Sequence, residues 1–237
     1  MSYYEIQGGR PLGGALAVHG AKNSVLPILA ACLLVPGQCV LHNCPDLSDV
    51  SATLDILRLL GCRADREGDT VIIDASAVNR SDIPEHLMRE MRSSVIFLGA
   101  LLARLGAAEL SYPGGCELGP RPIDLHLAAL RALGAEILEE QGALACRCCR
   151  GGLRGRELCL SIPSVGATEN AMLAACGCPG VTTVVGGARE PEIIDLQSFL
   201  QAAGAQVEGA GTSTITIQGG LPLHPVEYRV MGDRIAA

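Results

Sequence analysis

Three stretches of this sequence share one order of helix and strand, and this repeat constrains the fold more than any other feature. Each stretch pairs an apolar helix and a short strand with a second helix, which ends at a glycine and is followed by two more short strands. The closing glycines Gly61, Gly134 and Gly204 lie 73 and 70 residues apart, and a glycine just past a helix takes the left-handed conformation that stops it. A repeat of this period predicts three stacked copies of one supersecondary unit.

The helices that open the units are apolar nearly all round, most clearly in residues 25–34 and 95–102. Helices of this kind belong in a protein interior. We therefore expect an α/β fold in the form of an inside-out α/β barrel, with three β-α-β-α-β-β repeats, helices inside and sheets outside. A complete three-repeat domain is predicted over residues 21–225, with repeats at about 21–80, 84–150 and 157–219.

Two end segments fall outside this repeat. Residues 1–20 contain two candidate strands, at 3–7 and 15–19, separated by a turn rich in Gly and Pro. Residues 226–237 hold another candidate strand, which we interpret as a crossover. We expect both segments to belong to a second domain that is mostly absent from this chain.

The cysteine content and the net charge limit the compartment and the kinds of ligand that we expect. The chain has 11 cysteines, an odd number scattered through apolar runs, which is typical of reduced cysteine in a cytoplasmic protein. The N-terminus has no signal-peptide pattern, and the most apolar stretch, residues 25–35, is too short to span a bilayer. Cys146, Cys148 and Cys149 lack a second ligand pair at zinc spacing, so we expect no metal. The net charge of −7 argues against nucleic-acid binding, but the local field of a pocket can still favour a small anionic substrate.

Residues 113–126 read Pro-Gly-Gly-Cys-Glu-Leu-Gly-Pro-Arg-Pro-Ile-Asp-Leu-His, a composition that predicts a shaped surface loop leading into a helix. Loops of this kind carry function more often than cores do. Cys116 lies among glycines, and a nearby cation such as Arg121 can lower the pKa of a thiol. Taken alone, a Gly-Gly-Cys run favours the plainer interpretation of a long turn with an incidental cysteine.

Six motifs run in order along the chain: Gly-Ala-Lys-Asn at 20–23, Met-Arg-Ser at 91–93, the run at 113–126, Pro-Ser-Val-Gly-Ala-Thr at 163–168, Ala-Arg-Glu-Pro-Glu at 188–192 and Tyr-Arg-Val-Met-Gly-Asp-Arg at 228–234. Together they resemble the UDP-N-acetylglucosamine 1-carboxyvinyltransferase (UDP-N-acetylglucosamine enolpyruvyl transferase) family. Members of this family have two domains of three repeats each. The resemblance therefore implies an enolpyruvyl transferase-like fold, of which this chain is the N-terminal half.

The resemblance also implies a reaction: transfer of the enolpyruvyl group of phosphoenolpyruvate to the 3-hydroxyl of UDP-N-acetylglucosamine, with release of phosphate. This is the first committed step of peptidoglycan precursor synthesis, and so serves cell wall biogenesis, cell shape and cell division. No cofactor is implied, and the implied partners are the two substrates and the second domain of the same enzyme. Two alternatives stay open: the related transferase that acts on shikimate 3-phosphate, and a non-catalytic sugar-nucleotide-binding module.

The candidate site residues come partly from their own chemistry. An ammonium at the start of a helix, as expected for Lys22, suits a phosphate or carboxylate, and the planar guanidinium of Arg121 suits paired phosphate oxygens. The resemblance implies that Lys22 and Arg92 contact phosphoenolpyruvate. It implies that Cys116 is a general acid, which can form a covalent adduct with this substrate and is the residue that fosfomycin alkylates. The substrate-binding residues that it implies are Lys22, Asn23, Arg92, Arg121, Pro122, Ile123, Asp124, Leu125, His126, Ser164, Val165 and Gly166.

The chain also departs from the family pattern. Ile162 stands two residues before Ser164, where some members carry a lysine. Glu190 and Glu192 are expected at a helix start, where carboxylates are favoured, and we interpret them as structural. In the family the second half supplies the aspartate taken as general base, so this chain is expected to hold half an active site and to be inactive alone.

Overall fold

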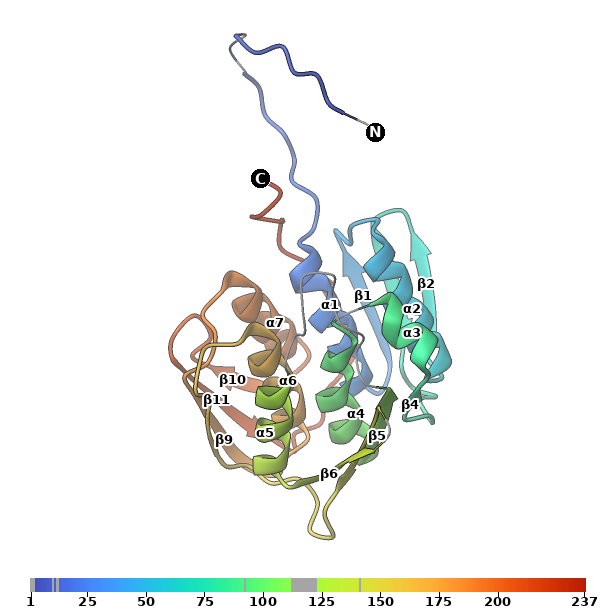
Figure 1. The fold of residues 1–237 in the computed structure, drawn as a ribbon, viewed down its shortest axis with the longest axis vertical. Helices are drawn as coiled ribbons and strands as arrows, with labels where there is room; N and C mark the ends of the chain where they lie inside the picture. Colours follow the sequence, from blue (N-terminus) through green and yellow to red (C-terminus); the bar gives the residue numbers. More distant parts are fainter. Residues whose placement is uncertain (1–2, 10, 12, 92, 112–122, 141) are drawn as a thin grey trace.

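The computed structural model describes residues 3–9, 11, 13–91, 93–111, 123–140 and 142–237. Three four-stranded sheets surround a set of helices (Figure 1). The first unit comprises α1 (Lys22–Ala31), η1 (Cys32–Leu34), β1 (Gln38–His42), α2 (Ser48–Leu59), β2 (Arg63–Glu67) and β3 (Thr70–Asp74). The second comprises β4 (Asp82–Ile83), α3 (Glu85–Glu90), η2 (Ser94–Ile96), α4 (Phe97–Leu105), β5 (Ala107–Ser111), α5 (Asp124–Leu133), β6 (Ala135–Glu140) and β7 (Ala143–Cys148). The third comprises β8 (Glu157–Cys159), α6 (Val165–Cys176), β9 (Gly180–Val185), α7 (Pro191–Ala202), β10 (Gln206–Glu208) and β11 (Thr214–Gly219), and β12 (Val226–Arg229) follows it.

The three sheets have one topology. Their strand orders are β12-β1-β3-β2, β4-β5-β7-β6 and β8-β9-β11-β10. In each sheet the first two strands pair in parallel and the other neighbours pair antiparallel. The predicted repeat is therefore confirmed, and with it the fold class of an inside-out barrel with sheets outside.

The first sheet takes its fourth strand from the other end of the sequence. β12 pairs in parallel with β1, with Cys39 opposite Val226 and His42 opposite Arg229. The second and third sheets take the corresponding strands, β4 and β8, from residues just before their own helices. The boundary expected at residue 225 therefore runs through the first sheet, because residues 226–229 complete it.

The closing glycines behave as their positions predict. Gly61, Gly134 and Gly204 have φ values of 102°, 106° and 100°. A residue with a Cβ is strained in this region of backbone conformation. Each glycine thus ends its helix and turns the chain back into the sheet that covers the helix.

Small residues allow the inner helices α4 and α6 to approach closely. A Cβ at Gly99 would lie 2.6 Å from Oδ1 of Asn170, and a Cβ at Gly177 would lie 2.6 Å from the Cβ of Ala103. The contacts advance in the same direction along both helices, so α4 and α6 run parallel. Together with α1 they fill the interior (Figure 1), which confirms the expectation that the apolar helices lie inside.

The helical path from α3 to α4 is broken. α3 ends at Glu90, and Met91 is extended, with φ −128° and ψ 111°. Met91 is fully buried, and its sulfur accepts a hydrogen bond of 2.8 Å from the hydroxyl of Thr53. The break thus coincides with burial of this side chain against α2, a tertiary contact that sequence periodicity does not reveal.

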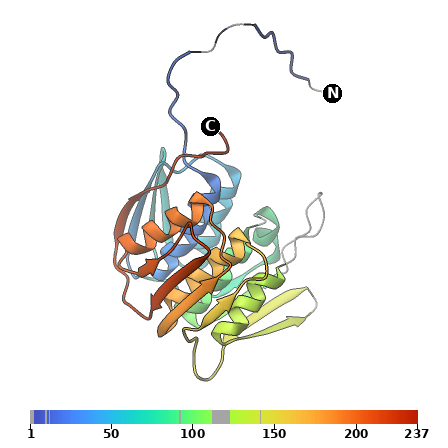
Figure 2. The ribbon, with the colours of Figure 1, turned by 90° about the vertical axis from the view of Figure 1, so that its left-hand side faces the viewer.

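The segment before α1 extends away from the domain (Figure 2). Among its described residues, none from 3 to 19 forms a strand, so the strands expected at 3–7 and 15–19 do not form in this structure. A strand needs a neighbouring edge for its backbone hydrogen bonds, and the described residues of this segment meet one only at its end, where the carbonyl of His19 accepts a hydrogen bond of 2.8 Å from the backbone N–H of Asp233. The side chains of Tyr3, Tyr4, Ile6 and Leu16 are exposed. Among the described residues, no helix has both the length and the apolar character needed to cross a membrane.

Candidate active site at the N-terminal ends of the helices

The first turns of the helices meet at one end of the domain, where both chain termini also emerge (Figure 1). Three contacts between different helices define this end: Lys22 of α1 with Asp49 of α2, Ser24 of α1 with Asp195 of α7, and His126 of α5 with Gly166 of α6. The start of a helix carries partial positive charge and free backbone N–H groups. Helix ends that gather in this way favour an anionic ligand.

Lys22 is the only lysine in the sequence; every other member of the 18 basic Lys and Arg residues is an arginine. It is the first residue of α1, and the residue at the N-cap position, Ala21, supplies no side-chain hydrogen bond to the helix. Its Nζ lies 2.9 Å from Oδ2 of Asp49, and its side chain is 44% exposed. The ammonium is thus held in place by one carboxylate but remains open to a ligand. The next residue, Asn23, is exposed.

The start of α5 packs against the start of α6. The ring of His126 lies so close to Gly166 that a Cβ there would be 2.9 Å from ring atom Cε1. Ser164 caps α6, because its Oγ accepts a hydrogen bond of 3.4 Å from the backbone N–H of Ala167. Asp124 is exposed at the same end. This junction therefore brings residues 123–126 and 164–166 together.

One buried amide fixes the protonation of His126. The backbone N–H of Gly99 must donate, so the atom of Asn170 that it contacts at 2.6 Å is the amide oxygen. The amide nitrogen then donates to the carbonyl of Val95 (2.8 Å) and to Nδ1 of His126 (2.9 Å). The neutral ring must accept at Nδ1 and carry its proton on Nε2. Asn170 thus joins α4, α5 and α6 through a single side chain.

The surroundings of His126 oppose its protonation. Burial lowers the pKa of its imidazole to about 4, and the charge of Asp124 only partly offsets this effect. A proton on Nδ1 would also face the donating amide of Asn170. The ring is neutral at physiological pH, so it orders the α5–α6 junction and contributes no positive charge to a ligand.

A buried acidic group lies beside this junction and was not identified as such from the sequence. Glu169 of α6 is 6% exposed, and its Oε1 has no hydrogen-bond partner among the described residues. Burial, followed by the charges of Glu192 and Glu190, raises the pKa of Glu169 well above its usual value. Glu192 is itself buried and accepts a hydrogen bond of 3.1 Å from Nε of Arg234. This ion pair supports the structural interpretation of Glu192.

Four predicted site residues, Arg92, Cys116, Arg121 and Pro122, lie outside the described residues. Other cysteines can be described. Burial raises the pKa values of the Cys44, Cys62, Cys176 and Cys178 thiols to about 12, and that of Cys146 to about 11. These thiols are not reactive at neutral pH, in agreement with their interpretation as core residues.

Ile123 and Ile162, two positions that the sequence singled out, differ in their exposure to solvent. Ile123 is buried at 5% exposure and anchors the start of α5 in the core. Ile162, which stands where some family members carry a lysine, is 61% exposed. Leu125 and Val165 are partly buried and pack against the core. No contact among the described residues joins Lys22 directly to the α5–α6 junction.

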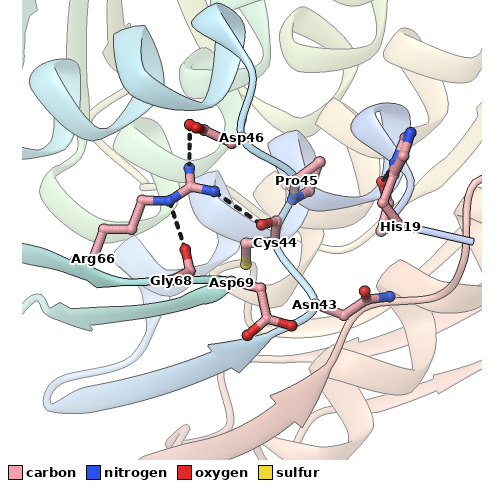
Figure 3. Close-up of a pocket in the computed structure, with 9 residues that line it drawn as sticks. His19, Asn43, Cys44, Pro45, Asp46, Arg66, Gly68 and Asp69 are labelled. Atoms are coloured by element: carbon pink, nitrogen blue, oxygen red, sulfur yellow. Dashed lines mark hydrogen bonds and ion pairs between the residues drawn. The ribbon is translucent and has the colours of Figure 1, made fainter. Parts of the chain in front are cut away.

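A cavity of about 400 Å³ lies at the turn that follows β1 (Figure 3). Arg66 crosses it and donates to the carbonyls of Gly68 (2.9 Å) and Cys44 (3.0 Å), while Asp46 lies 3.6 Å from its Nη1. These contacts hold the turn between β1 and α2, the helix that carries Asp49. Because Arg66 already serves the backbone here and no predicted site residue lines the cavity, we do not assign substrate binding to it.

The fold and the site define an enolpyruvyl transferase-like domain. The chain belongs to the EPSP synthase (3-phosphoshikimate 1-carboxyvinyltransferase) family, because a model of that family matches residues 6–237. A crystal structure of the enolpyruvyl transferase NikO from Streptomyces tendae has a TM-score of 0.83 and 28% identity, and the match covers 98% of this chain and 55% of that one. EPSP synthase from Acinetobacter baumannii shares the fold with a TM-score of 0.72 at 21% identity, over 92% of this chain and 50% of that one.

Within this family, the chain is similar over nearly its whole length to UDP-N-acetylglucosamine 1-carboxyvinyltransferases. The chain is 51% identical to UDP-N-acetylglucosamine 1-carboxyvinyltransferase 2 of Caldanaerobacter subterraneus subsp. tengcongensis, over 100% of this chain and 56% of that protein. It is 46% identical to UDP-N-acetylglucosamine 1-carboxyvinyltransferase of Mycobacterium tuberculosis, over 99% of this chain and 56% of that protein. The resemblance inferred from the motifs is thus confirmed, and the chain spans about half the length of the relatives that it matches.

Proposed function

We propose that this chain forms one half of an enolpyruvyl transferase that moves the enolpyruvyl group of phosphoenolpyruvate to the 3-hydroxyl of UDP-N-acetylglucosamine and releases phosphate. The observation that carries the proposal is the placement of the only lysine, Lys22, among converging helix starts, at the end where the 113–126 motif enters α5. The identity to relatives named for this activity supports the same substrates. The product would enter peptidoglycan precursor synthesis in the cytoplasm.

The roles of the residues follow from charge and geometry. The ammonium of Lys22 and the starts of the helices stabilise the phosphate or carboxylate of phosphoenolpyruvate, and we assign Arg92 to the same substrate. Cys116 acts as the proton donor when the sugar hydroxyl attacks and the tetrahedral adduct forms. The remaining half of the longer protein supplies the general base, so the chain by itself is inactive.

The sugar nucleotide is assigned to the α5–α6 junction. Arg121 and Pro122 lead into α5, and its first turn, residues 123–126, faces the start of α6 at residues 164–166. Backbone N–H groups at a helix start suit a diphosphate. Ile162 carries no charge, so a cation that contacts the diphosphate would have to come from another segment. His126 belongs to this set as the residue that holds the junction together.

Fosfomycin labelling tests the proposal on the purified chain. With peptide mass spectrometry, we expect modification of Cys116 that increases when UDP-N-acetylglucosamine is present and does not increase with shikimate 3-phosphate. Cys159 is exposed and serves as an internal control for unselective alkylation. Equal labelling of Cys116 and Cys159 would contradict an activated thiol, and enhancement by shikimate 3-phosphate alone would favour the other transferase.

Phosphoenolpyruvate binding is tested in a second experiment. Because Lys22 is the only lysine, a chain isotopically labelled at lysine gives a single side-chain NMR signal. We expect phosphoenolpyruvate to shift this ammonium resonance, and Lys22→Ala to abolish binding in calorimetry. A chain that binds UDP-N-acetylglucosamine while its Lys22 signal ignores phosphoenolpyruvate would instead be a sugar-nucleotide-binding module without a catalytic site.

A further inference from the structure

Two buried carboxylates on one face of α7 hold the last described segment of the chain. Glu192 and Asp195 are 3% and 8% exposed, and residues three apart lie on the same side of a helix. Arg234 donates to Glu192 at 3.1 Å. Asp195 accepts a hydrogen bond of 2.6 Å from the hydroxyl of Tyr228 and one of 3.2 Å from the backbone N–H of Met231.

Asp195 also reaches the helix that carries Lys22. Its Oδ2, the atom that accepts from Met231, accepts a hydrogen bond from the hydroxyl of Ser24, the third residue of α1. Ser24 is fully buried, so this hydroxyl cannot turn to water instead. One carboxylate therefore joins α1, α7 and the segment that follows β12.

The start of α1 is tied to the same segment through its backbone. The N–H of Ala21 donates to the carbonyl of Met231 at 2.9 Å, and the N–H of Lys22 donates to Oδ2 of Asp233 at 3.4 Å. Gly20 and Gly232 form an antiparallel bridge. These backbone contacts at the start of α1 thus depend on where residues 231–233 lie, and Asp195 fixes Met231 at the start of that stretch.

The geometry points to Asp195 as a positioning residue for Lys22. It accepts three hydrogen bonds, which a buried carboxylate requires, and their donors lie on α1 (Ser24), in β12 (Tyr228) and just after β12 (Met231). The orientation of the first turn of α1 fixes the direction in which the Lys22 side chain leaves the backbone. This inference rests on the proposed role of Lys22 in binding phosphoenolpyruvate.

The clearest test compares two mild substitutions that each remove one hydrogen bond to Asp195. Ser24→Ala removes the bond that reaches α1. Tyr228→Phe removes the bond on the other oxygen and keeps the edge-to-face packing of the ring on Phe199. Both variants lose a bond to the same carboxylate, so a purely structural role for Asp195 predicts similar behaviour from them.

We expect Ser24→Ala to speed hydrogen exchange at the Lys22 amide about tenfold, the factor expected for one lost charge-assisted hydrogen bond. We expect it to weaken phosphoenolpyruvate binding by a similar factor and to move the single lysine resonance. Tyr228→Phe should lower the melting temperature but leave the exchange, the affinity and the resonance within twofold of the native chain. Asp195→Asn should reproduce Ser24→Ala if it folds.

The inference is overturned if Ser24→Ala leaves exchange at Lys22 and the affinity unchanged, or if Tyr228→Phe changes them equally. Failure of the native chain to bind phosphoenolpyruvate would refute the proposed function of this chain alone. In that case exchange at the Lys22 amide still decides whether Asp195 orders the first turn of α1.

Discussion

Lowering the pH should destabilise this domain through one imidazole, and the effect can be isolated by comparing the native chain with His126→Asn. In the folded chain, burial lowers the pKa of His126 to about 4, whereas an unfolded histidine titrates near 6.5. Between these values the unfolded state binds more protons than the folded state. Stability that is present above pH 6.5 is therefore lost as the pH falls towards 4.

The magnitude follows from the two pKa values. With one pKa unit equal to about 1.4 kcal/mol, linkage gives a loss of about 1.4 kcal/mol at pH 5.5 and about 2.6 kcal/mol at pH 4.5, relative to pH 7.5. Asparagine keeps an acceptor for the amide of Asn170 near the position of Nδ1 but does not titrate. The smaller side chain lowers stability by a similar amount at every pH, so its cavity cancels when the pH dependences are compared.

Urea unfolding at pH 7.5, 5.5 and 4.5 measures the difference. Carboxylates titrate in both proteins, so the free energy of unfolding should fall in both, but by about 2.6 kcal/mol more in the native chain at pH 4.5. Parallel pH profiles would refute the reasoning. They would mean that the imidazole is not kept neutral by burial and by the amide of Asn170.

Three further variants test individual features of the core. Thr182→Val should raise the free energy of unfolding by about 1 kcal/mol, because the buried hydroxyl of Thr182 has no hydrogen-bond partner in the described part of the chain. A lower free energy of unfolding in urea would show that the hydroxyl is bonded. Glu169→Gln should stabilise the chain at pH 7.5. Burial and the charge of Glu192 raise the pKa of Glu169, so the stability that the protonated carboxyl provides is lost as the pH rises through that pKa. The gain in free energy of unfolding should shrink towards pH 4.5, and a constant gain would contradict this. Gly99→Ala should lower the free energy of unfolding by about 1–3 kcal/mol, because its Cβ would lie 2.6 Å from Oδ1 of Asn170 and closer still to the backbone oxygen of that residue. An unchanged melting temperature would show that α4 and α6 can move apart.

The sequence predicts the repeat well because the signals for it are local. A glycine with positive φ is needed wherever a helix must stop and turn, so Gly61, Gly134 and Gly204 mark three equivalent places without any knowledge of the tertiary structure. The apolar character of the inner helices likewise follows from their burial on all sides. These features are set within one unit, and the three units repeat them.

The buried polar contacts could not be predicted in the same way. The triplet Ile-Asp-Leu leads into α5 and recurs within the first half of α7, yet Asp124 is exposed and Asp195 is buried. Asp124 lies ten residues before its closing glycine and Asp195 lies nine before its own. One residue turns a side chain by about 100° around a helix, which is enough to move it from solvent to the core. The partners of Asp195 lie on α1 and after β12, far away in sequence.

The positions of the buried polar side chains indicate which parts of the helices are held in a defined orientation and which parts mainly stabilise the fold. Apart from Thr182 on β9, those in the described part of the chain lie in the first half of a helix or just before one: Ser24, Thr53, Ser94, His126, Thr168, Glu169, Asn170, Glu192 and Asp195. The second halves of the same helices are buried through apolar side chains alone. Hydrogen bonds add less to stability than apolar packing does, but they hold groups in defined directions. The helix starts that carry Lys22 and the α5–α6 junction are therefore fixed by directional contacts, and the far ends of the helices supply the apolar burial that makes this possible.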